Sequence, residues 1–293
     1  MSSLRKALII GGLCLLSLGL AGCNALRLGY SNGPTLAWLW IDGYADFDSN
    51  QSPAVKAAIG RWFDWHRGSQ LPAYATLLAE AQADVLAPTT PEAACNLQER
   101  ATTLLAPAAD RAIAEAVNVV PLLDERQFAH MAQRYAKGND EMKRDFMQAD
   151  AAERRKASIK RTVERVERVY GRIGDAQRQV IEAGVEASPF DAEVWLKERE
   201  RRQVDILQTL RRLRSESADA AARSAALRSL ADRGQRSQMP EHRAYQQRLR
   251  DHNCAFAARI HNAMTPAQRG KARDTLKGWE DDLRSLTAAA RTD

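Results

Sequence analysis

The chain has 293 residues, of which 45% are hydrophobic and 27% are charged, and its formal net charge is +6. Beyond the first 22 residues about 271 remain, which is enough for one large helical domain or two small ones. Beyond the first 22 residues no apolar run is long enough to span a bilayer, so we expect no transmembrane helix there.

The N-terminus has the pattern of a bacterial lipoprotein signal. Basic Arg5 and Lys6 precede an apolar stretch over residues 7–20, and the small residues Ala21 and Gly22 precede Cys23. A lipoprotein pathway uses that thiol to accept a diacylglyceryl group, and each buried methylene of its acyl chains contributes roughly 0.8 kcal/mol to membrane binding. We therefore predict a signal peptide over residues 1–22 and lipidation at Cys23. The alternatives are a plain signal whose Cys is accidental and an uncleaved anchor.

The residue after the lipidation site favours a destination. Asn24 stands where Asp would signal retention in the inner membrane, so the predicted location is the periplasmic face of the outer membrane. Residues 23–34 are predicted to be a lipidated tether that ends in a turn at Asn32-Gly33-Pro34, and residues 35–293 to be a single all-helical periplasmic domain.

The charge is unevenly distributed between the two halves. Residues 24–150 carry 11 Lys and Arg against 16 Asp and Glu, a net charge of −5, whereas residues 151–293 carry 30 against 21, a net charge of +9. An exported protein does not ordinarily meet nucleic acid, so anionic lipid head groups or acidic proteins are the expected partners of the basic half. The alternative is a solvated basic face without a specific partner.

An aromatic and acidic segment follows the tether. The candidate binding cluster consists of Trp38, Trp40, Asp42, Asp46, Trp62, Trp65 and His66. Large aromatic side chains at helical spacing are usually core residues, which is one interpretation. The others are a binding site and a hydrolase cleft around Asp42, Asp46 and His66.

The acidic residues do not form a calcium loop. Residues 46–50 match the start of an EF-hand, but Gln51 stands where the loop needs Gly and Ala57 where it needs the bidentate Glu. We interpret the carboxylates as a polar turn or helix cap.

Helices account for the rest of the chain. Ser52-Pro53 predicts a helix start before residues 54–68, and further helices are predicted over 71–85, over 92–118 with an interruption at Pro107, and over 123–137 with an end at Gly138-Asn139. Asp124 with Gln127 and Thr265 with Gln268 form capping boxes, in which side chains satisfy the free amides of a first turn.

The longest periodic region lies between these two boxes. Apolar residues over 159–180 follow a coiled-coil-like spacing with Gln177 as the one polar intrusion, Ser188-Pro189 marks a turn, and residues 194–213 give a return helix. This predicts a long antiparallel hairpin. Helices over 219–232, 245–260 and 264–283 complete the chain, and no alternating pattern predicts a sheet. The predicted fold is all-α, an elongated multi-helix bundle with a long central helical hairpin.

Two cysteines lie in the mature chain beyond the anchor, Cys95 and Cys254. In the oxidising periplasm such a pair favours a disulfide. The long loop that it would close corresponds to about 5 kcal/mol in the chain-entropy model. Two free thiols are the alternative.

The sequence carries no motif typical of an enzyme. It has no phosphate-binding loop, nucleophile elbow or metalloprotease helix, and its five His residues show no metal-ligand spacing. We therefore expect no catalytic residues, no metal and no cofactor.

Several aromatic motifs follow the lipidation site: Tyr30-Ser31-Asn32, Trp38-x-Trp40-Ile41-Asp42-Gly43-Tyr44-x-Asp46-Phe47, Arg61-Trp62-x-x-Trp65-His66 and Leu71-Pro72-x-Tyr74. In this combination the chain resembles an uncharacterised family of Gram-negative outer-membrane lipoproteins, over nearly the whole mature chain. That family has no established activity, so the resemblance implies location rather than mechanism.

The two capping boxes resemble the LTxxQ motif of Spy and CpxP, helical periplasmic proteins of the envelope stress response, one of them a chaperone. Thr265 and Gln268 match the motif while Met264 replaces its Leu, and Leu123 and Gln127 match while Asp124 replaces its Thr. The expected function is a non-enzymatic binding protein, such as a Spy-like holdase for protein clients. The alternative is an envelope scaffold that tethers a partner protein.

Overall fold

The computed structural model describes residues 25–216 and 218–289, and these residues form helices without any β-strand. The predicted all-α class is therefore confirmed. The helices are α2 (Ala25–Ser31), α3 (Gly33–Ala45), α4 (Ser52–Ser69), α5 (Leu71–Asp84), α6 (Pro91–Ala116), η1 (Val120–Leu122), α7 (Glu125–Phe146), α8 (Ala151–Tyr170), α9 (Asp175–Glu186), α10 (Ala192–Ser215), α11 (Ala220–Gln235), α12 (Pro240–Asn262) and α13 (Pro266–Ala289). The predicted signal peptide and Cys23 lie outside the described residues.

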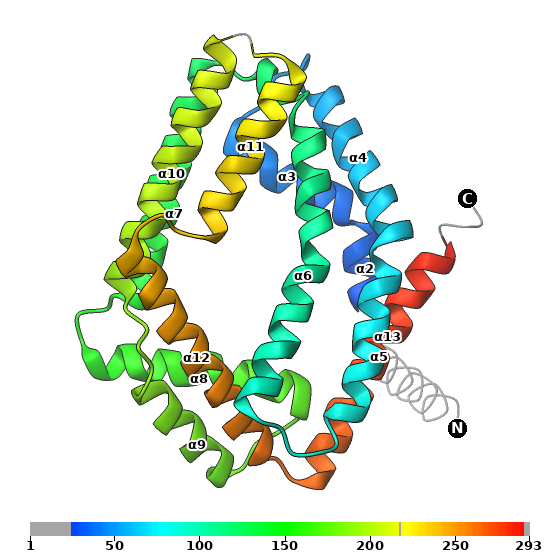
Figure 1. Cartoon of the computed structure of the whole chain (residues 1–293), viewed down its shortest axis with the longest axis vertical. Helices are drawn as coiled ribbons and strands as arrows, with labels where there is room; N and C mark the ends of the chain where they lie inside the picture. Colours follow the sequence, from blue (N-terminus) through cyan, green and yellow to red (C-terminus); the bar gives the residue numbers. More distant parts are fainter. Residues whose placement is uncertain (1–24, 217, 290–293) are drawn as a thin grey trace, which may run out of the picture.

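The helices are arranged as a frame (Figure 1). α7 and α10 pack along each other on one side, α5 packs along α13 on the other side, and α8, α9 and α12 lie at one end. α6 runs between the two ends and contacts α4, α5, α11 and α12. In the part of the chain that the structure describes, no helix combines the length and the apolar character needed to cross a membrane.

The core is divided into three clusters, each at a place where several helices meet. Phe128 of α7 anchors one of them together with Ala45, Leu123 and Met131. A second cluster joins η1 to α10 and α11 through Val117, Val120, Leu213 and Leu227. The third joins α8 and α9 to α12 and contains Val163, Val166, Ile173, Ile181, Ile260 and Met264.

The predicted disulfide is present. Cys95 lies in the first turns of α6 and Cys254 lies in α12, and their Cα atoms are 5.3 Å apart across a sequence separation of 159 residues. The bond therefore closes the frame between two helices that already pack together.

The predicted hairpin between residues 159–180 and 194–213 is wrong. The chain leaves the helix at Gly171, whose φ of 75° is unfavourable for residues with a side chain, and a new helix begins at Asp175. The apolar stripe of α8 packs with α9, the end of α12 and α13, whereas α10 packs along α7.

Three other predicted boundaries are corrected. The residues predicted as a tether form α2 from Ala25 onward, which contacts α3 and α13. α6 continues through Pro107 without interruption. α7 runs past Gly138 to Phe146, and Gly138 lies against Arg199 of α10: a Cβ there would lie 3.1 Å from the guanidinium Nη2.

Candidate functional site

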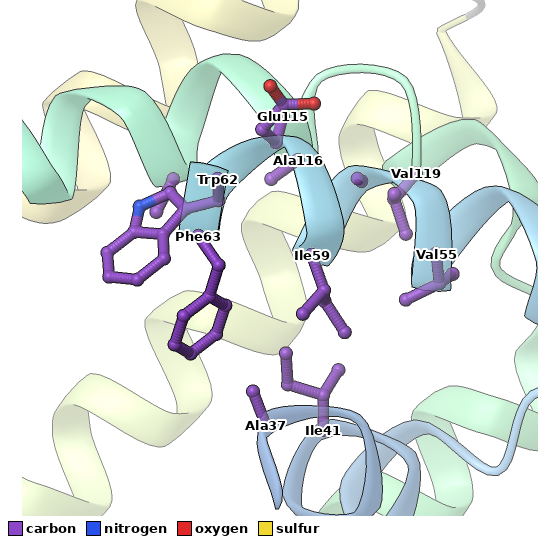
Figure 2. Close-up of a pocket in the computed structure, with 11 residues that line it drawn as sticks. Ala37, Ile41, Val55, Ile59, Trp62, Phe63, Glu115, Ala116 and Val119 are labelled. Atoms are coloured by element: carbon purple, nitrogen blue, oxygen red, sulfur yellow. The ribbon is translucent and has the colours of Figure 1, made fainter. Parts of the chain in front are cut away.

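An apolar pocket of about 400 Å³ lies between α3, α4 and α6 (Figure 2). We call it the α3–α4–α6 pocket. Glu115 is the one charged residue in its lining, which consists of Ala37, Ile41, Val55, Ala58, Ile59, Trp62, Phe63, Ala112, Glu115, Ala116 and Val119.

The pocket results from small residues placed opposite large ones. On α4, Val55, Ile59 and Trp62 recur at helical spacing and so share one face. The facing positions on α6 carry alanines, including Ala112 and Ala116, whose methyl groups are too short to fill the space between the helices. The spacing was visible in the sequence, but which helix faces α4 was not.

The polar side chains of the lining are already paired. Trp62 donates its Nε1–H to the carbonyl of Ala108 at 2.9 Å. Glu115 accepts from Arg61 Nη2 at 2.7 Å and from Arg111 Nη2 at 2.6 Å. The interior of the pocket therefore offers a ligand hydrocarbon contact and no free side-chain hydrogen-bonding group.

The predicted cluster residues do not converge on one site. Trp62 lines the pocket. Trp38 instead stacks on Phe47 with ring centroids 5.9 Å apart, and Lys56 Nζ lies 4.5 Å from the Trp38 ring. Trp40 is 68% exposed.

The remaining tryptophan, Trp65, packs beside a cation. The guanidinium carbon of Arg111 lies 5.9 Å from the centroid of its ring. Because Arg111 also binds Glu115, this contact helps to hold the ion pairs at the edge of the pocket.

The acidic members of the cluster shape the end of α3. Asp42 Oδ1 accepts a hydrogen bond from the Phe47 backbone N–H at 3.0 Å. Asp46 adopts a left-handed conformation with φ of 50°, ends the helix, and pairs its carboxylate with Arg126 of α7. These carboxylates therefore serve the turn after α3, as the helix-cap interpretation predicts.

His66 is buried in α4 and contacts aromatic side chains. Its Nδ1 lies 2.8 Å from the Tyr30 hydroxyl, and its ring stacks on Trp62 with centroids 4.5 Å apart. Burial lowers the pKa of His66 below its ordinary value and raises the pKa of Tyr30 to about 12. At neutral pH the Tyr30 hydroxyl therefore donates to a neutral imidazole, and none of these contacts joins His66 to Asp42 or Asp46.

This burial predicts acid sensitivity. Because the pKa of His66 is lowered on folding, the unfolded state binds more protons once the pH falls below about 6.5, and stability is then lost. We expect His66→Gln to flatten the decline in the free energy of unfolding between neutral pH and the folded-state pKa, measured by urea titrations at several pH values.

His242 provides a matched variant for His66. Burial also lowers the pKa of His242, so His242→Gln should remove a different part of the same decline. An unchanged pH dependence in His66→Gln would contradict the assignment.

The two predicted capping boxes are confirmed. Asp124 Oδ1 accepts from the Gln127 N–H at 2.8 Å, and Gln127 Oε1 accepts from the Asp124 N–H at 2.9 Å. Thr265 and Gln268 make the same pair of bonds at 3.2 and 2.9 Å.

One further complete box was missed in the sequence, and so was a half box at Gly174, which has no side chain to accept from the Gln177 N–H. Asp48 and Gln51 exchange the same two bonds at 2.9 and 3.1 Å, within the segment that fails as a calcium loop. Gln177, which interrupts the apolar spacing, accepts from the Gly174 N–H at 2.9 Å. The signal was an apolar residue, a cap and a Gln three positions later, which occurs at all four places.

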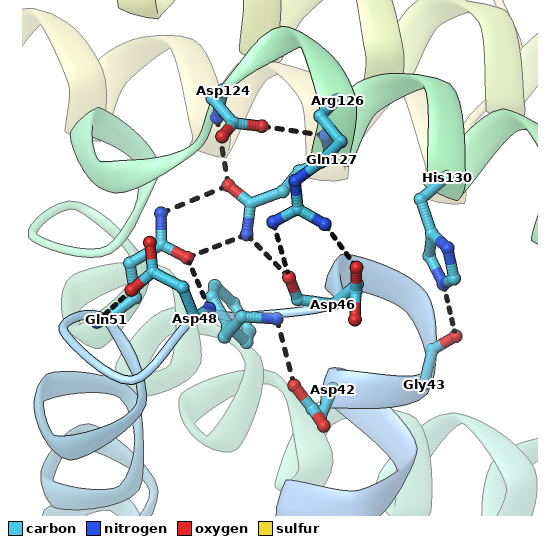
Figure 3. Close-up of polar contacts among 10 residues, drawn as sticks. Asp42, Gly43, Asp46, Asp48, Gln51, Asp124, Arg126, Gln127 and His130 are labelled. Atoms are coloured by element: carbon cyan, nitrogen blue, oxygen red, sulfur yellow. Dashed lines mark hydrogen bonds and ion pairs between the residues drawn. The ribbon is translucent and has the colours of Figure 1, made fainter.

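The three complete boxes and the half box at Gly174 meet in two pairs (Figure 3 shows the first). Gln51 and Gln127 each donate Nε2–H to the other's Oε1, at 3.1 and 2.8 Å. Gln177 donates to Gln268 Oε1 at 3.3 Å. The first pair lies beside the Phe128 cluster and joins α4 to α7; the second joins the starts of α9 and α13.

Each glutamine also bonds the backbone just before its partner's box. Gln127 Nε2 donates to the Asp46 carbonyl at 3.4 Å, and Gln51 donates to the Leu122 carbonyl. In the second pair, Gln177 donates to the Ala263 carbonyl at 3.0 Å and Gln268 to the Arg172 carbonyl at 2.9 Å. The two pairs therefore share the same side-chain-to-backbone bonds, whereas the glutamines of the first pair each donate to the other and in the second pair only Gln177 donates.

Over the described residues, no group of three or more His, Cys, Asp or Glu side chains is arranged to hold a metal ion.

Comparison with known proteins places the chain in a family. No curated protein and no solved structure matches the chain. The model of a family of unknown function, DUF6279, matches residues 43–243. Because this match covers most of the chain, the protein belongs to that family.

Proposed function

We propose that the protein is a non-enzymatic binding protein, held by lipid at Cys23 on the periplasmic face of the outer membrane, that retains unfolded or acidic envelope proteins. The observation that carries the proposal is an apolar surface on α3. Leu36, Leu39 and Trp40 are 56%, 59% and 68% exposed. Their spacing of three and four residues places them on one side of the helix, which we call the α3 face. Exposed apolar patches of this kind are typical of interaction sites.

A second surface is both apolar and basic. Phe190 and Trp195 are partly exposed and make edge-to-face contacts with Phe146, and the guanidinium of Arg161 lies 4.3 Å from the Phe146 ring. Phe190, Trp195 and Arg161 belong to the half of the chain beyond residue 150, which has a net charge of +9. Positive charge beside aromatic side chains supports a preference for acidic clients.

The proposal of a non-enzymatic role is supported by how the polar groups are used. Asp42, Asp46 and His66, the candidates for catalysis, bind a backbone amide, an arginine and a half-buried tyrosine. These are contacts of a helix end and a core, so they leave no acid and base facing one substrate.

A holdase assay tests the function. Protein from residue 24 onward should suppress the aggregation of an acidic client at equimolar ratio, and more weakly at high salt because screening reduces the attraction. Leu36→Ser with Leu39→Ser should lower the suppression, since the pair removes most of the aliphatic area of the α3 face.

The matched control lies on α6. Leu105 is 56% exposed and Leu97 is 41% exposed, so Leu97→Ser with Leu105→Ser removes comparable apolar surface elsewhere and should leave suppression unchanged. Absence of suppression by the unaltered protein at equimolar ratio would count against a holdase.

A scaffold role is the second candidate, and the cross-linked frame favours it. The Cys95–Cys254 disulfide and the two glutamine pairs fix helices that are far apart in the sequence. A pre-organised surface suits a stable partner, because binding then costs little conformational entropy. Crosslinking in cells discriminates: one dominant stoichiometric partner indicates a scaffold, and many different clients indicate a holdase.

A further inference from the structure

We propose that the α3–α4–α6 pocket binds a long acyl chain whose anionic head group lies at the pocket edge. This goes beyond client binding and uses a different surface, since Ala37 and Ile41 line the pocket whereas Leu36, Leu39 and Trp40 form the α3 face.

The lining selects for hydrocarbon. The pocket volume of about 400 Å³ lies within the range of roughly 300–1,000 Å³ that is usual for small-molecule sites. Its two polar side chains, Trp62 and Glu115, already have partners. A peptide or nucleotide would bury donors and acceptors there without partners, which is costly, whereas a hydrocarbon chain has none to satisfy.

The pocket edge favours a negative head group. Two guanidinium groups, of Arg61 and Arg111, meet the single carboxylate of Glu115, so the edge carries one excess positive charge. Arg61 is 52% exposed at its side chain and Glu115 is 13% exposed, so the cation is the accessible partner. A carboxylate or phosphate at this edge would pair with a guanidinium.

A free fatty acid or anionic phospholipid of the membrane has both the hydrocarbon chain and the negative head group. An acyl chain of lipidated Cys23 is a second source of hydrocarbon, because α3 is the pocket helix nearest to that residue in the sequence, but it carries no anionic group to pair with the arginines. The experiment below separates the two.

Quenching by dibromostearate tests the site. In the full chain carrying Cys23→Ser, bromine atoms in the pocket should quench the fluorescence of Trp62 saturably. Trp62→Phe should abolish the saturable part of the quenching. The fatty acid should still raise the melting temperature of this variant, because it still binds the folded state. Fatty acids shorter by two methylenes should bind roughly tenfold more weakly.

A filled pocket provides the matched comparison. Ala112 lines the pocket whereas Ala114, exposed on the same helix, does not, so Ala112→Phe should lose saturable quenching and Ala114→Phe should retain it. Circular dichroism melting of both variants shows that each remains folded, and the client suppression attributed to the α3 face should persist in both.

The lipidated protein identifies the source. In vesicles of phosphatidylcholine, lipidated chain that resists quenching while the Cys23→Ser chain is quenched would show that its own acyl chain fills the pocket; quenching of both would show an external lipid. The proposal is overturned if the folded Cys23→Ser chain shows no saturable quenching, or if Ala112→Phe and Trp62→Phe are quenched as strongly as the parent. Either failure would leave the holdase result unaffected.

Discussion

Replacing Cys95 and Cys254 with serine should lower the free energy of unfolding by roughly 2 to 5 kcal/mol. The bond closes a loop with a sequence separation of 159 residues, and a loop of that length restricts the unfolded chain strongly. The measurement is urea unfolding, followed by circular dichroism, of protein from residue 24 onward, which contains these two cysteines and no others.

Reduction gives the matched control for this variant. Unaltered protein in reductant should unfold at the same urea concentration as the double serine variant, because both lack the same cross-link. If reductant leaves the midpoint of the unaltered protein unchanged, the bond does not contribute to stability in solution.

Replacing Gln127 with alanine should lower the free energy of unfolding by roughly 2 to 4 kcal/mol. Its side chain is fully buried, and its loss leaves the Asp124 N–H without a partner. It also removes one hydrogen bond each from the Gln51 amide and the Asp46 carbonyl, which keep Leu122 and Arg126 as partners. Buried polar groups that lose a partner cannot recover it from water, which is why the cost exceeds that of an ordinary helix cap.

Gln268→Ala is the matched comparison. It removes the equivalent box at the start of α13, but Gln268 is only half-buried, so water can replace part of what is lost. We expect a loss of about 1 kcal/mol, typical of a helix N-cap, by the same urea titration. Equal losses for the two variants would contradict the role assigned to burial.

Helix starts and their capping bonds were predictable, because they depend on residues that are close in the sequence. The capping boxes at Asp124 and Thr265, the start of α4 near Pro53 and the helix after Asp219 all follow from side chains within one turn. The disulfide was predicted from two cysteines and from the oxidising compartment that the predicted signal peptide implies.

Helix pairing was not predictable, because it depends on contacts between distant segments. Residues 159–180 and 194–213 carry compatible apolar stripes, yet one glycine at position 171 redirects the first of them toward α12 and α13. Gly138 and Asn139 looked like a helix end because those residue types often are one. In the structure Asn139 is buried and binds Gln203 and Arg199 of α10.

The candidate site could be predicted only in part. The aromatic segment was recognised, and Trp62 does line the pocket. The pocket itself depends on small residues of α3 and α6 facing α4, and residue types alone do not reveal an unfilled space. Trp38, Trp65 and His66 have the packing role that large aromatic side chains usually have.

The paired glutamines also bear on where the folding unit ends. The partners are separated by 76 residues in one pair and by 91 in the other. The family match ends at residue 243, so it contains Gln177 but neither Gln268 nor Cys254. A fragment truncated at that boundary would retain one complete pair, expose Gln177 and leave Cys95 unpaired. The segment that the family model matches is therefore shorter than the segment that these bonds connect.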